Sequence, residues 1–170
     1  QATAVIAMAL FTADQRPFLM IGGRGPLKDE LRSQVQSRGL ADRVKFLDYI
    51  PDNCIPAYYA AADVFVLPSV VDARGDTEGL GVVLLESLAC ETPCVASEVG
   101  GIVDVIDDGE NGVLVEPRSP QALAEGISLI VSDAQLREEM GKRGHELVEK
   151  SFSWQAQADG ILKIYEKVIR

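Results

Sequence analysis

Short apolar runs alternate with longer segments of helical periodicity along most of the chain. The short runs are bounded by glycine, proline or aspartate and predict strands, which we place at 18–22, 44–47, 63–67, 94–97 and 112–116. The longer segments predict helices, with one short helical turn, at 2–13, 27–38, 51–61, 79–90, 100–106, 119–131, 133–150 and 153–169. This alternation predicts an α/β fold with a doubly wound, mostly parallel, Rossmann-like sheet and helices on both faces.

The segment 76–97 concentrates the features that suggest chemistry. Two acids and two glycines precede an apolar run, and between Gly79 and Cys90 the only charge is Glu86. Abundant leucine and alanine predict a helix that should be buried against the sheet, because it is apolar on nearly all sides. Glycines at a helix start let the backbone approach a ligand, and the free N–H groups there favour an anion such as phosphate.

The loops that follow the strands are expected to meet at this helix start. Ligands of doubly wound sheets bind at the carboxyl ends of the strands. The turn 22–26 and the loops 48–53, 68–78 and 97–102 should therefore surround one cleft together with the start of the helix. The alternative is a plain glycine-initiated core helix with Glu86 facing solvent.

Glu78 and Glu86 are the two acids of this segment that we consider for a role in chemistry, and they lie eight residues apart. On one helix, a rise of 1.5 Å per residue would separate their backbones by roughly 12 Å. The carboxyl groups of glycosidases that act on one scissile bond are about 5 to 10 Å apart. The spacing therefore suits the two ends of one elongated ligand.

Length, charge and cysteine content narrow the class of protein. The 170 residues suffice for one domain, 1–170, that ends in a C-terminal helix within 153–170. The net charge of −10 argues against nucleic-acid binding and makes an anionic ligand depend on local cations or amides. Three cysteines in apolar segments predict reduced thiols in a cytoplasmic protein. With a single histidine far from Cys90 and Cys94, we expect no metal site.

Several motifs carry a resemblance to a known family. The string E-G-L-G-V-V-L-L-E from Glu78 to Glu86, followed by T-P-C-V-A-S, resembles the signature of the retaining, nucleotide-sugar-dependent glycosyltransferases of the GT-B fold, the group 1 or family-four class. The segments I-G-G-R-G-P, V-K-F-L-D-Y-I-P-D, I-P-A-Y-Y-A-A-A-D-V-F-V-L-P-S, V-G-G-I-V-D-V-I and D-G-E-N-G-V-L-V-E-P are also similar to the family pattern. Glu91 departs from the usual glycine, and Leu80 from a common phenylalanine.

The resemblance implies that the chain is the C-terminal, donor-binding domain of such an enzyme. The donor would be a UDP-sugar or GDP-sugar, the product a hexosylated glycan, lipid or small molecule of the kind made in cell-envelope polysaccharide synthesis, and no metal or other cofactor would be required. The family's first, central strand, its phosphate-binding Arg and Lys, and its N-terminal acceptor domain would precede Gln1. Acceptor binding, and any contact with the inner membrane face, would belong to that missing domain, so the isolated fragment should be inactive.

The resemblance also assigns roles to single residues. Glu78 would be the catalytic residue beside the transferred sugar, and Glu86 would accept hydrogen bonds from the donor ribose. The residues assigned to the donor are Glu86, Gly79, Leu80, Gly81, Val82, Ile50, Gly22 and Arg24. Among these, the backbone of Ile50 would meet the base and Arg24 would supply positive charge, although a solvated turn explains Arg24 equally well. Gly22, like Gly100 and Gly101, shapes a loop in the simpler interpretation.

Two other classes of function stay open at this point. One is a nucleotide-binding module without chemistry, which the absence of the phosphate-binding Arg and Lys favours and the two-glutamate motif disfavours. The other is a sugar-nucleotide epimerase that shares the GT-B architecture. The sequence shows no serine–histidine pair and no cysteine environment typical of a nucleophile, which fits a domain that positions a donor and stabilises its leaving diphosphate.

Overall fold

The computed structural model describes residues 1–71, 75–77 and 79–169. Its strands are all parallel and form two sheets. β1 (Leu19–Gly22) pairs with β2 (Val44–Asp48), while β4 (Cys94–Ser97) lies between β3 (Phe65–Leu67) and β5 (Gly112–Val115). The predicted α/β class with parallel strands is confirmed. The described strands form two separate sheets, because no strand of one sheet pairs with a strand of the other. That a central strand precedes Gln1 stays a prediction.

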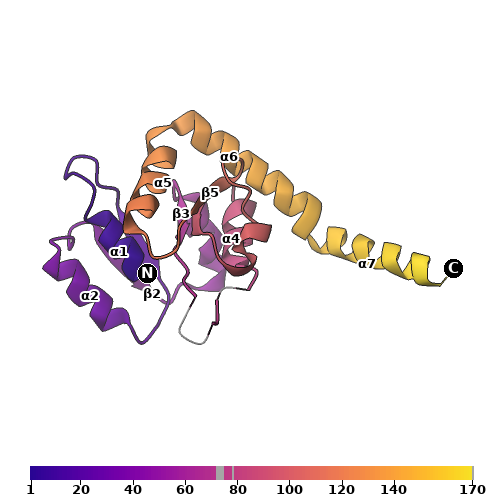
Figure 1. Ribbon diagram of the computed structural model, residues 1–170, viewed down its shortest axis with the longest axis horizontal. Coiled ribbons are helices and arrows are strands. Elements are labelled where there is room, and N and C mark those ends of the chain that lie inside the picture. The colour runs from indigo at the N-terminus through magenta and orange to yellow at the C-terminus, as the bar shows by residue number, and fades with distance from the viewer. Residues whose placement is uncertain (72–74, 78, 170) are drawn as a thin grey trace.

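Helices connect the strands and follow them in the predicted order (Figure 1). The α-helices are α1 (Ala2–Met8), α2 (Lys28–Ser37), α3 (Ile55–Ala60), α4 (Val82–Ala89), α5 (Pro120–Ser132), α6 (Ala134–Leu147) and α7 (Trp154–Val168). Short 3-10 segments occur at η1 (Asp52–Cys54) and η2 (Gly100–Asp104), and a π-helical segment, η3 (Val148–Phe152), follows α6.

Two predicted helix boundaries were wrong for identifiable reasons. The helix predicted at 2–13 ends at Met8. The apolar run extends further because Phe11 packs against the core from the following loop. The helix predicted at 79–90 begins only at Val82, because Gly81 has φ +70°, a left-handed conformation that α-helical residues do not adopt.

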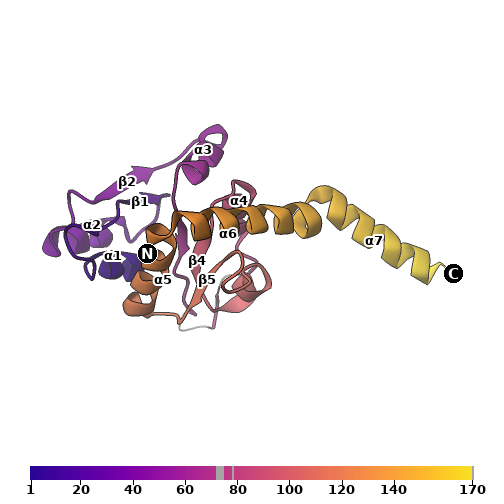
Figure 2. The same cartoon turned by 90° about the horizontal axis from the view of Figure 1, so that it is seen from above.

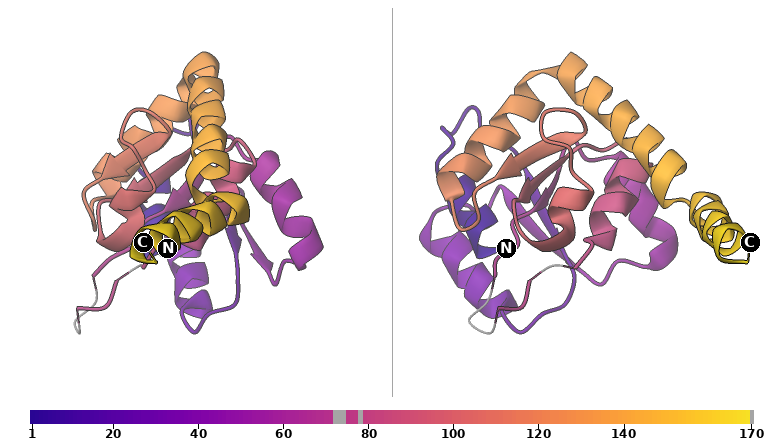
Figure 3. Two further views of the ribbon diagram at one scale, coloured as in Figure 1. Left: turned by 90° about the vertical axis from the view of Figure 1, so that its right-hand side faces the viewer. Right: turned by 45° about the vertical axis from the view of Figure 1, so that its right-hand side comes forward.

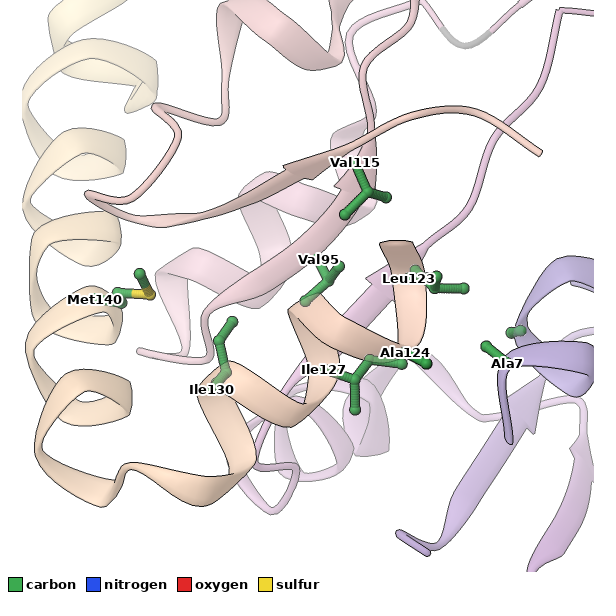
Figure 4. Close-up of a cluster of buried hydrophobic side chains, with 9 residues drawn as sticks. Ala7, Val95, Val115, Leu123, Ala124, Ile127, Ile130 and Met140 are labelled. Carbon is green, nitrogen blue, oxygen red and sulfur yellow. The ribbon is translucent and has the colours of Figure 1, made fainter. Parts of the chain in front are cut away.

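The central strand β4 separates two hydrophobic clusters. All four of its residues are buried, and successive side chains point to opposite faces of the sheet. Val95 joins a cluster with α1, α5 and α6, in which Ile130 and Met140 are almost fully buried (Figure 4). Cys94 and Ala96 join a second cluster with α4 and η2. Helices therefore cover both faces of this sheet, as predicted.

The smaller sheet is covered by α1 and α2. Val5 and Met8 of α1 pack with Leu31 and Val35 of α2 and with Val44 of β2. The adjacent side of α1 contributes Ala4 and Ala7 to the cluster around α5. Helix α1 therefore belongs to the hydrophobic clusters of both sheets.

Helix α7 projects away from the rest of the chain (Figures 1 and 2). None of its residues is buried, and its apolar stripe includes Ile161, Tyr165 and Val168, each more than half exposed. The right-hand view of Figure 3 shows the same projection. Within the described residues, no helix is both long and apolar enough to cross a membrane.

Candidate functional site

The start of α4 is built by a left-handed glycine. Gly81 caps the helix with φ +70°, and its carbonyl oxygen accepts a hydrogen bond of 2.7 Å from the N–H of Leu84. No side chain among the described residues caps this end of the helix. The side chains of Leu80 and Val82 are exposed at this helix start, whereas Gly81 between them is buried. Together with the helix dipole, the N–H groups here form the type of site that binds an anion.

The turn after β4 packs directly against this helix start. A Cβ atom on Gly101 would lie 2.0 Å from the carbonyl oxygen of Gly79 and 3.3 Å from the Cα atom of Leu80. Any other residue at 101 would displace backbone, so glycine is required for this close approach. By contrast, a Cβ atom on Gly79 would have no neighbour within 4 Å. The predicted meeting of loop 97–102 with the helix start is therefore confirmed at Gly101.

The turn after β1 and the loop after β2 form a second contact group. A Cβ atom on Gly22 would lie 2.9 Å from Cδ1 of Ile50. The N–H of Gly23 donates a 2.7 Å hydrogen bond to the carbonyl oxygen of Asp48. Arg24 lies over the ring of Tyr49, with its guanidinium carbon 5.5 Å from the ring centre. Gly22, Arg24 and Ile50 are thus brought together, and Gly22 shapes a loop as expected.

Glu86 lies on the exposed side of α4, so the expectation that this helix is buried on nearly all sides was wrong at this position. One carboxylate oxygen, Oε2, accepts a hydrogen bond of 3.0 Å from the hydroxyl of Tyr59 on α3. Burial, and next the neighbouring Glu86, raise the pKa of Tyr59 well above its ordinary value. The phenol therefore stays protonated and keeps donating to the carboxylate.

Tyr59 is the residue that sequence reasoning missed. Its ring also packs edge-on against Phe65 at a centroid distance of 5.3 Å, and its carbonyl oxygen accepts a 2.8 Å hydrogen bond from the hydroxyl of Thr92. In the sequence Tyr59 stands beside Tyr58, and composition does not distinguish the two. Only the helical spacing within α3, combined with the position of α4, could have identified it.

Glu78 lies outside the described residues, so its catalytic role stays a prediction. The estimate of roughly 12 Å between Glu78 and Glu86 assumed one continuous helix. Because α4 begins at Val82, that assumption was wrong, although the glutamates can still serve different ends of a ligand.

Cys90 and Cys94 have the character of structural thiols. Burial raises the pKa of Cys94 to about 12, and burial followed by the nearby Glu86 raises the pKa of Cys90. A thiol whose pKa is raised is a poor nucleophile at neutral pH. In the described part of the chain, no three His, Cys, Asp or Glu side chains gather as they would around a metal ion.

Two hollows in the surface lie at opposite edges of the fold. One of about 180 Å³ follows β1 and is lined by Arg24, Leu27 and Lys28 among others. The other, about 640 Å³, lies before β3 and β4, between Ala60, Pro93 and Arg137. Since ligands of doubly wound sheets bind at the carboxyl ends of strands, the smaller hollow is on the side expected for the ligand despite its size.

Comparison with known proteins identifies the family. Residues 1–147 match the family described as glycosyl transferases group 1. The GDP-mannose-dependent alpha-(1-6)-phosphatidylinositol monomannoside mannosyltransferase of Mycobacterium tuberculosis is 33% identical over 141 residues, which are 82% of this chain and 37% of that enzyme. The chain thus spans little more than a third of the length of the curated relatives that it matches.

Solved structures share the fold over almost the whole chain. Anabaena HepE in complex with UDP-glucose has a TM-score of 0.81 and 25% identity, with 98% of this chain and 45% of that chain covered. The C-terminal domain of the group 1 protein LpcC from Francisella tularensis has a TM-score of 0.72 and 29% identity, with 90% and 77% covered. With its GT-B type fold and a family match over most of its length, the chain belongs to the group 1 glycosyltransferases.

Proposed function

We propose that the chain is the donor-binding half of a retaining glycosyltransferase, which transfers a hexosyl group from a nucleoside-diphosphate sugar to a glycan, lipid or small-molecule acceptor. The observation that carries the proposal is the start of α4, which has no side-chain cap among the described residues and meets Gly101 at the carboxyl end of β4. Its N–H groups and dipole would stabilise the diphosphate. The relatives that use GDP-mannose or bind UDP-glucose support this class of donor.

In this proposal the two glutamates contact different parts of the donor. Glu86 is exposed and already oriented by Tyr59, so it can accept hydrogen bonds from the ribose hydroxyls. Glu78 would lie beside the sugar and the positive charge that develops on it. The leaving phosphate oxygen would take the acceptor proton, and the domain would supply positioning and electrostatic stabilisation without a metal ion.

The acceptor side of the reaction would require residues outside this chain. Because the chain spans little more than a third of its curated relatives, we propose that it binds donor and transfers no sugar by itself. Residues upstream of Gln1 would supply the cations for the diphosphate and the domain for the acceptor.

The test is nucleotide binding by the chain, followed with amide chemical shifts and calorimetry. UDP or GDP should first shift the amides of residues 79–82, whereas shifts confined to α5, α6 and α7 would rule out this placement. Glu86→Ala should weaken UDP or GDP by about 1–3 kcal/mol, as expected when hydrogen bonds to a charged group are lost. The matched control is Glu125→Ala, since Glu125 on α5 also accepts one neutral hydrogen bond, from Gln121 at 2.8 Å. Equal losses in both variants would contradict the role of Glu86.

The role of Glu78 is tested in the intact enzyme. Glu78→Ala should lower turnover strongly and leave the affinity for free UDP or GDP nearly unchanged, because the lost interaction strengthens only in the transition state. Steady-state rates and calorimetry on the same variant measure the two effects. If Glu78→Ala and Glu86→Ala reduce nucleotide affinity equally, the two glutamates do not bind different ends of the donor.

A further inference from the structure

An ion pair joins the two segments that follow β1 and β2. The ammonium group of Lys28, the first residue of α2, contacts the carboxylate of Asp48, the last residue of β2. A lysine in the first turn of a helix is unfavourable with respect to the helix dipole. The helix itself therefore gives no reason for Lys28 at this position, whereas the contact with Asp48 does.

Asp48 has an unusual backbone conformation. Its φ of +58° lies in the left-handed region, which costs free energy for residues other than glycine and is tolerated best by Asn and Asp. The strand register also shifts between Ile21 and Gly22, so that Gly22 pairs with Asp48. Such conformations persist only where the surroundings hold them in place.

Two contacts hold the left-handed conformation of Asp48 in place. The carbonyl oxygen of Asp48 accepts the 2.7 Å hydrogen bond from Gly23, and its carboxylate is paired with Lys28. The hydrogen bond from Lys28 is the main cause that lowers the pKa of Asp48, with smaller contributions from Arg32 and Arg24. The carboxylate is therefore ionised at neutral pH, and backbone and side chain of one residue fasten the end of β2 to the turn after β1.

The contact determines where the next two residues lie. Tyr49 and Ile50 directly follow Asp48; Tyr49 lies beneath Arg24, and Ile50 packs over Gly22. Rotation of the backbone at Asp48 would move both of them. Loop 48–53 is thus fixed at its first residue, Asp48, by contacts with the start of α2 and with the turn after β1.

We propose that Lys28 and Asp48 are positioning residues for the nucleoside end of the donor. The pair fixes loop 48–53, so that the backbone of Ile50 is presented to the base. Lys28 also lines the smaller hollow, and the role assigned to it here is exerted through Asp48 and the loop. This inference rests on the proposed function, in which Ile50 meets the base.

The experiment compares Lys28→Met and Asp48→Asn with the parent chain. Asparagine keeps the tolerance for positive φ, so Asp48→Asn removes the charge with little added backbone strain. Affinities for UDP, GDP and inorganic pyrophosphate are measured by calorimetry, and the exchange rate of the Gly23 amide is measured by NMR. Lys142→Met is the matched control, because it breaks an equivalent pair with Glu138 on the surface of α6. Lys28→Arg keeps the charge and should behave like the parent.

Both test variants should bind UDP and GDP roughly two- to fivefold more weakly, the scale expected from a partly exposed ion pair. The UDP-to-GDP affinity ratio should change, pyrophosphate affinity should stay at the parent value, and the Gly23 amide should exchange faster. Lys142→Met should change none of these quantities.

Three results would overturn the inference. Unchanged Gly23 exchange would show that the pair does not hold the two segments together. Faster exchange with unchanged nucleotide affinities would show that it does so without positioning the ligand. Equal loss for UDP, GDP and pyrophosphate would indicate a direct contact of Lys28 with the diphosphate or a general disturbance of the fold. Failure of the parent chain to bind any nucleotide is a different result, which contradicts the proposed function itself and removes the positioning role with it.

Discussion

Helices α4 and α7 both carry apolar side chains, but different interactions stabilise them. Helix α4 has eight residues and no side-chain cap in the described structure, yet Leu84 and Leu88 are fully buried. Helix α7 has fifteen residues and a cap from Ser153, whose hydroxyl oxygen accepts the N–H of Ala156, yet none of its residues is buried. The first is stabilised by its neighbours, and the second by its own local interactions.

The difference explains how α4 can be stable without a side-chain cap from the described residues at its N-terminus. An isolated helix of eight residues is not stable in water, so α4 depends on packing against the sheet and α6. Because packing supplies its stability, the N–H groups at its start need no side-chain cap and can face a ligand. Where a helix lacks such packing, as α7 does, a cap contributes a larger fraction of the stability of the helix.

The largest expected contrast is between two leucines. Leu88→Ala should lower the free energy of unfolding by about 2–5 kcal/mol, because it leaves a cavity between α4 and its neighbours. Leu162→Ala in α7 removes the same atoms from a side chain that is 58% exposed, and should cost under about 0.5 kcal/mol. Urea denaturation of both variants measures the difference. Similar losses would show that α7 is packed in solution in a way that the structure lacks.

A pair of glycines should give effects of opposite sign. A Cβ atom on Gly144 of α6 would lie 2.5 Å from Cδ2 of Leu88, so Gly144→Ala should destabilise the fold by about 1–3 kcal/mol through overpacking, even after the gain in helix propensity. A Cβ atom on Gly160 of α7 would have no neighbour within 4 Å, so Gly160→Ala should increase the helicity of α7, by up to about 1 kcal/mol. Thermal unfolding and circular dichroism separate the two results. Stabilisation by Gly144→Ala would mean that the contact between α6 and α4 is looser than described.

The same contrast shows what the sequence could predict. The five strands were found within two residues of their observed ends, because short apolar runs bounded by glycine, proline or aspartate leave few alternatives. The start of α4 was misplaced by three residues, since the left-handed φ of Gly81 is a property of the folded backbone. The helix at 153–169 was also predicted from its hydrophobic periodicity, but such a pattern predicts a packing face and does not show what covers it.

The candidate site was predictable where motifs are continuous in sequence. The glycines at 79, 81 and 101 form part of such motifs, and the structure brings Gly101 against Gly79. The hydrogen bond between Tyr59 and Glu86 and the ion pair between Lys28 and Asp48 join residues 27 and 20 positions apart. Such pairs depend on how helices and strands pack, which hydrophobic periodicity alone does not determine.

The smallest expected contrast is between two serine caps with the same geometry. Ser119 caps α5 and Ser153 caps α7, each accepting a backbone N–H at 3.2 Å. Replacing either serine with alanine should cost about 1 kcal/mol of helix stability. Helix α5 is packed in the core, so Ser119→Ala should lower the free energy of global unfolding by that amount. Helix α7 has no buried residue, so Ser153→Ala should speed amide exchange within α7 and leave the urea midpoint of the domain unchanged. A fall in the midpoint for Ser153→Ala equal to that for Ser119→Ala would show that α7 unfolds together with the core, and that local interactions are not what holds it.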